Sequence, residues 1–183
     1  MPRESFKAVN EICLVDIRNK YFKYVDRDTG EVTDRKIEDV HSEISSIILS
    51  TQVPKEIQSS FNTARKLALY SWYCYAFHQT AEMKAFSSLE EALKLKFGST
   101  NKGLRDLIKK ALNHCDIRDR GFQHIAPPED PESIEYSLKL VDLIPSMRNR
   151  LAHGSQTLHN QSGLTLSICA DFINQLFTYE KDN

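Results

Sequence analysis

One short stretch of the chain, RNRLAHG from Arg148 to Gly154, places two guanidinium groups, an amide and an imidazole beside a glycine. Asn149 and His153 are four residues apart and share one face of a helix, so we expect the amide to orient the imidazole. Arg148 lies five residues before His153, roughly 140° away around the helix axis. The two groups therefore meet only if Gly154 loosens the last turn or if a second copy of the helix supplies one of them. The second option implies a symmetric dimer.

These residue types suit phosphate chemistry without a metal. His153 is expected at the C-terminal end of a helix capped by Gly154, where the helix dipole favours the protonated imidazole. A proton donor near neutral pH needs that bias. Arginine binds phosphate oxygens and stabilises negative charge that develops around phosphorus. The set is suited to cleaving RNA through its own 2′-hydroxyl.

The stretch RNRLAH resembles the R-[polar]-x-x-x-H signature of the HEPN superfamily, small α-helical bundles found in toxins, phage-defence proteins and RNases. Arg148 matches the family arginine, Asn149 the polar residue that follows it and His153 the family histidine. The region from Pro54 onward, roughly the last 130 residues, is similar to the family bundle, and the chain looks like a HEPN-like group of bacterial proteins. The resemblance implies a metal-independent endoribonuclease of stress response or phage defence, working as a homodimer whose facing arginines and histidines form the cleft.

The same residues also fit an alternative without catalysis. A basic helix end occurs in HEPN-like bundles that only dimerise or bind RNA or a nucleotide, and an N-terminal appendage then recruits a protein partner. The formal net charge of -1 gives no global basic field, so any nucleic-acid contact has to come from a local patch.

Four further residues are candidates for supporting roles. Arg150 and His159 are candidates for contacts with RNA phosphate, although Arg150 equally fits a solvated or acid-paired side chain. Glu82 and Glu90 are eight residues apart and lie near one face of a helix. In a bundle such a glutamate can face the Arg148 helix and position the guanidinium, while the alternative is a solvated carboxylate.

No metal or cofactor is expected. His114 and Cys115, with His124, come nearest to a metal cluster, but adjacent residues of a helix point about 100° apart and no fourth ligand has suitable spacing. The chain also lacks a phosphate-cradling glycine loop.

The cysteines and the hydropathy pattern indicate a reducing cytoplasm and no membrane. The four cysteines are far apart and form no C-x-x-C pair, so disulfides are not expected. No window approaches the roughly 18 apolar residues that a membrane span requires.

An all-α fold must position these side chains. Of 183 residues, 40% are hydrophobic, which suits one domain with an appendage. Residues 1–53 form the expected appendage, with a β-hairpin whose turn uses Gly30 and a short helix after it. Residues 54–183 form the expected HEPN-like bundle of four or five helices. Residues 55–97 fit either one long helix or two, with a break near Ser87–Glu91.

Overall fold

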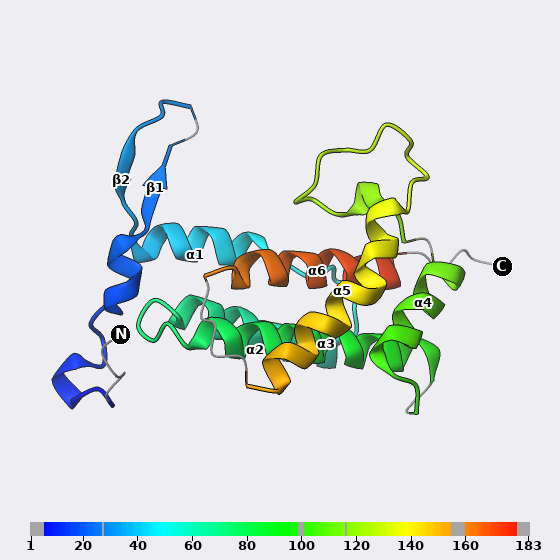
Figure 1. Ribbon diagram of the computed structural model, residues 1–183, viewed down its shortest axis with the longest axis horizontal. Coiled ribbons are helices and arrows are strands. Elements are labelled where there is room, and N and C mark those ends of the chain that lie inside the picture. Colours follow the sequence, from blue (N-terminus) through cyan, green and yellow to red (C-terminus); the bar gives the residue numbers. More distant parts are fainter. Residues whose placement is uncertain (1–5, 27, 99–100, 116, 155–159, 179–183) are drawn as a thin grey trace.

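The computed structural model describes residues 6–26, 28–98, 101–115, 117–154 and 160–178 (Figure 1). The described chain is mostly helical and carries a small antiparallel sheet near its N-terminal end. The α-helices are α1 (Ile37–Ser46), α2 (Lys55–Tyr70), α3 (Phe77–Phe97), α4 (Leu104–His114), α5 (Glu135–Ala152) and α6 (Ser162–Phe177). The strands are β1 (Lys23–Val25) and β2 (Val32–Asp34), and the short 3-10 helices are η1 (Val9–Glu11), η2 (Ile17–Tyr21) and η3 (Asp119–Gly121).

Helix α3 is the centre of the bundle and packs against α2, α4, α5 and α6. Its buried positions lie on several sides of the helix, and three of the nine are alanine, which lets neighbouring helices approach closely. Two buried polar contacts tie α3 to α6. The Nδ1 atom of His78 lies 2.6 Å from the Oγ atom of Ser162, and Thr165 Oγ1 donates to Glu82 Oε1 at 2.9 Å.

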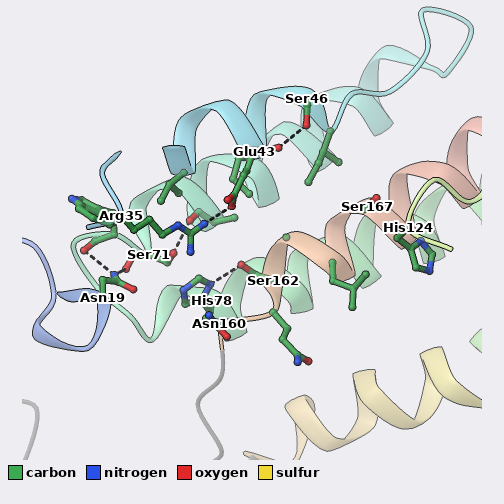
Figure 2. A pocket seen from close by; sticks show the side chains of 18 residues that line it. Asn19, Arg35, Glu43, Ser46, Ser71, His78, His124, Asn160, Ser162 and Ser167 are labelled. Atoms are coloured by element: carbon green, nitrogen blue, oxygen red, sulfur yellow. Dashed lines mark hydrogen bonds and ion pairs between the residues drawn. The ribbon is translucent and has the colours of Figure 1, made fainter. Parts of the chain in front are cut away.

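The chain makes two helices between residues 55 and 97, and the break is not at Ser87–Glu91, which lies inside α3. The break falls at Ser71–Ala76 instead. Asn19 Nδ2 donates to the carbonyl oxygens of Ser71 and Trp72, at 2.8 and 3.0 Å (Figure 2). The amide of Tyr75 donates to Asp16 Oδ2 at 3.0 Å. The N-terminal segment therefore satisfies backbone groups that a continuous helix would have paired internally.

The predicted hairpin is present. Strands β1 and β2 pair antiparallel with Val25 opposite Val32, and Gly30 in the turn adopts φ 71°. Asp26 Oδ1 accepts the amides of Asp28 and Thr29, which closes the turn.

The later helices follow the apolar periodicity of the sequence. In α4 the apolar residues at helical spacing, Leu104, Leu107, Ile108 and Ala111, are buried, and Leu112 is half-buried. In α6 the apolar residues Ile168, Phe172, Ile173 and Leu176 are buried, whereas Leu164, which shares their period, is 45% exposed.

No helix in the described ranges combines the length and the apolar character that crossing a membrane would need. All four cysteines carry free thiols, and Cys169 is buried in the core.

Candidate functional site

Arg148 lies in the last turns of α5, where α5 packs against α3 and α4. Its Nη2 atom lies 3.6 Å from Glu90 Oε2, and its Nη1 atom donates to Asn149 Oδ1 at 3.3 Å. The side chain is 41% exposed, so the guanidinium is held on one side and open to solvent on the other. Because arginine carries five N–H donors, these two contacts leave donors free for an anion.

Glu90 is shared between two cations. Its Oε1 atom accepts from Lys94 Nζ at 2.6 Å, an i to i+4 pair on α3, while its Oε2 atom faces Arg148. The carboxylate is 20% exposed, so it is better shielded from solvent than the arginine it contacts. An ion pair this exposed adds at most about 1 kcal/mol to stability, so its main effect is to fix where the guanidinium lies.

A groove of about 360 Å³ runs beside this pair, between α3, the start of α4 and the end of α5. A second arginine, Arg105, lines it and forms a 2.6 Å ion pair with Asp142 on α5. The lining residues are Glu90, Gly103, Leu104, Arg105, Pro145, Arg148 and Asn149. The groove thus presents two guanidinium groups, each held by a carboxylate from another helix.

His153 is the C-cap residue of α5 and is exposed. Its amide donates to the Asn149 carbonyl at 2.9 Å, and Gly154, with φ 76°, donates to the Leu151 carbonyl at 3.1 Å. The expected glycine cap is therefore present, since a positive φ is what a residue just past a helix end needs. His153 does not line the groove that contains Arg148.

The expected bond between the Asn149 amide and the His153 ring does not form within the described part of the chain, where the Asn149 oxygen accepts from Arg148 instead. The physical reason is local. The backbone is still helical up to this point, since the His153 amide donates to the Asn149 carbonyl, but the Asn149 side-chain oxygen is engaged by the Arg148 guanidinium.

The remaining candidates fall in three different places. Of the two glutamates expected to position Arg148, Glu90 faces it, whereas Glu82 is buried against α6 and accepts a hydrogen bond from Thr165. Arg150 is exposed on α5. His159 lies outside the described residues.

A second cavity, of about 530 Å³, lies between the N-terminal segment, α1, the α2–α3 break and the start of α6 (Figure 2). Arg35 reaches into this cavity and pairs with Glu43 of α1, and the contact between His78 and Ser162 forms part of its wall. None of the residues predicted to be functional that the structure describes lines it. Within the ranges that the structure describes, no group of three or more histidine, cysteine, aspartate or glutamate side chains is placed to hold a metal ion.

The chain matches no protein-family model, no curated protein and no solved structure.

Arg105 is the groove residue that the sequence interpretation missed. The sequence carried one signal for this role. Arg105 is the second residue of α4, near the helix N-terminus, where the helix dipole disfavours a cation. A basic residue in that unfavourable place indicates a compensating partner, which is Asp142.

Proposed function

We propose that this chain is a metal-independent endoribonuclease of the HEPN type that acts as a homodimer in stress response or phage defence. The observation that carries the proposal is the half-exposed Arg148, held by Glu90 on the wall of a groove, with the exposed His153 at the capped end of the same helix. Both side chains are accessible to a phosphate group.

The chemistry needs a base, an acid and a cation. The 2′-oxygen of a ribose attacks the adjacent phosphorus while a base removes its proton, and the bond from phosphorus to the 5′-oxygen breaks as an acid protonates that oxygen. The products are a 2′,3′-cyclic phosphate and a 5′-hydroxyl. His153 supplies both functions, first accepting the 2′-proton as the base and then donating it to the 5′-oxygen as the acid, and Arg148 of the other copy stabilises the charge on the phosphoryl oxygens.

Two copies are required because one chain does not complete the set. Arg148 lines the groove and His153 does not. A two-fold axis near the end of α5 would bring the histidine of one copy toward the arginine of the other. Arg105 and the exposed Arg150 then extend the phosphate-binding surface along the RNA.

The direct test is cleavage of varied RNAs by the purified chain in the presence of EDTA. We expect cyclic-phosphate products, and a loss of at least about 100-fold in His153→Ala and in Arg148→Ala. The matched control is His41→Ala, which removes an exposed histidine from α1 and should leave the rate unchanged. Absence of cleavage across varied RNAs would refute the proposal.

Mixing the two inactive variants tests the shared site. A heterodimer of Arg148→Ala and His153→Ala retains one intact pair contributed by both copies, so random mixing should restore on the order of a quarter of the wild-type rate. If each chain carried a complete site, the mixture would stay inactive.

A non-catalytic module that dimerises or binds RNA or a nucleotide is the second candidate. It is favoured by the carboxylates that neutralise both guanidinium groups in the groove. Binding of labelled RNA, weakened by Arg148→Ala but never followed by cleavage, would select this alternative.

A further inference from the structure

The N-terminal arm, residues 6–34, exposes an unusual amount of apolar surface. Among the described residues, sixteen large hydrophobic side chains are exposed, and nine of them lie in this arm. They are Phe6, Val9, Ile12, Leu14, Ile17, Tyr21, Tyr24, Val25 and Val32. Single exposed apolar residues are ordinary, but a run of them along one segment marks a surface that another molecule covers.

The hairpin within the arm lacks support from the bundle. Each strand has three residues, and all six are exposed. A two-stranded hairpin with neither face packed is only marginally stable in water. Its outer edges carry backbone groups that are available for pairing with another strand. The hairpin therefore needs a covering surface that the described part of one chain does not provide.

The arm is nevertheless anchored at its base. The buried side chains of Asp16 and Asn19 bond to backbone groups of residues 71–75, and the Arg18 guanidinium stacks 4.7 Å from the centroid of the Tyr75 ring. Figure 1 shows the hairpin and the segment around η1 extending away from the helices on either side of this anchor. The apolar side chains are thus presented from a fixed base.

We infer that the N-terminal arm packs against the same arm of a second copy of this chain. The nine residues together expose as much area as about six fully exposed residues would, which is on the order of 1,000 Å². A stable interface of standard size buries about 800 Å² per partner. The arm alone therefore offers enough surface for a dimer.

The charge of the arm suits contact with itself. A two-fold interface brings a patch against its own copy, so a patch of one sign repels itself. Residues 6–34 contain five basic and six acidic side chains, which is nearly balanced. Opposite charges from the two copies can pair around the apolar centre.

The arm extends from the side of the bundle where α5 ends and α6 begins (Figure 1). Asn19 of the arm and Asn160, just before α6, line the same cavity. An arm contact would therefore lie on the same side of the bundle as the α5 ends that the proposed nuclease brings together, and in this respect the inference rests on the proposed function.

The test is the dimer dissociation constant of the full chain, measured by sedimentation equilibrium. Val25 and Val32 are cross-strand partners, so Val25→Lys with Val32→Glu keeps an attractive pair within the hairpin while placing charge on its face. The matched control is Leu95→Lys with Leu138→Glu, which makes the same exchanges at residues of α3 and α5 that are 49% and 54% exposed. We expect the arm variant to weaken the dimer at least about tenfold and the control to change it less than about twofold.

Amide hydrogen exchange provides the second measurement. The strands β1 and β2 should gain protection as the concentration of wild-type chain rises through the dissociation constant, and the arm variant should not. A wild-type chain that stays monomeric at about 100 μM, or a dimer equally tight in the arm variant, would overturn the inference.

RNA cleavage assayed on the same samples separates the two proposals. An arm-dependent dimer without cleavage refutes the nuclease and leaves the arm contact standing. Cleavage by a dimer that is insensitive to the arm variant supports the nuclease and refutes the arm contact.

Discussion

Removal of the Asp16 carboxylate should loosen the anchor of the N-terminal arm. Its Oδ1 atom accepts from the Arg18 amide at 3.0 Å and from Nε at 2.8 Å, and its Oδ2 atom accepts from Arg18 Nη2 at 2.7 Å and from the Tyr75 amide at 3.0 Å. Burial raises the pKa of Asp16, but the hydrogen bonds from Arg18 and Tyr75 outweigh it and lower the pKa to about 2. The ionised form is therefore the one that the folded state stabilises.

The magnitude follows from the groups left behind. In Asp16→Ala, the buried Tyr75 amide and the Arg18 guanidinium lose their acceptor, which should cost about 2–3 kcal/mol of unfolding free energy. In a chain of this length 1 kcal/mol corresponds to roughly 2–4 °C, so the melting temperature should fall by about 4–12 °C. Asp16→Asn keeps an acceptor for Tyr75 and should lose about half as much.

The pH dependence gives a separate check. Because the folded pKa of Asp16 is depressed, its contribution is fully present above the unfolded value of 3.8 and is lost as the pH falls through about 2. Thermal melts followed by circular dichroism at pH 7 and near pH 2 measure both effects, with the exposed Asp28→Ala as control. An Asp16→Ala chain that melts within about 1 °C of wild type at pH 7 would refute the reasoning, as would a deficit that stays undiminished near pH 2.

Three further results are expected. Glu90→Gln should lower kcat/KM for RNA cleavage about 2- to 5-fold, because it releases the Arg148 guanidinium. The neighbouring Glu91→Gln should leave kcat/KM unchanged. Equal initial rates for the two variants would count against the positioning role of Glu90. Gly154→Ala should lower the melting temperature by about 2–4 °C, because a φ of 76° strains a residue that carries a side chain. Gly154→Asn should lower the melting temperature less, since asparagine tolerates that conformation. Equal decreases in the two variants would contradict this reasoning. Burial raises the pKa of Asp171 to about 6, so the folded state favours its neutral form and the unfolding free energy should decrease as the pH rises from about 4 to about 6. Denaturant titrations at a series of pH values should show a flatter pH profile of the unfolding free energy in Asp171→Asn. An unchanged profile would contradict that assignment.

The elements with strong local signals were predictable from the sequence. The hairpin follows from a turn that ends in Gly30, the buried face of α4 follows from its apolar period, and the left-handed cap at Gly154 follows from a glycine after a basic helix end. Each depends on residues within a few positions of one another.

Features that depend on distant residues were not predictable. The chain breaks at Ser71–Ala76 because Asp16 and Asn19, more than fifty positions earlier, supply partners for its backbone. A sequence reading of residues 55–97 alone shows a continuous helix pattern, and the serine-rich stretch at 87–88 was the natural but wrong place for the break.

For the candidate site, the sequence by itself determined which residue types stand at the end of α5 and that Gly154 caps this helix. Only the tertiary structure decided that Glu90 and not Glu82 faces Arg148, and that Arg105 shares the groove. The physical reason is that helical periodicity fixes which side chains share a face, while the packing of one helix against another fixes which face meets which partner.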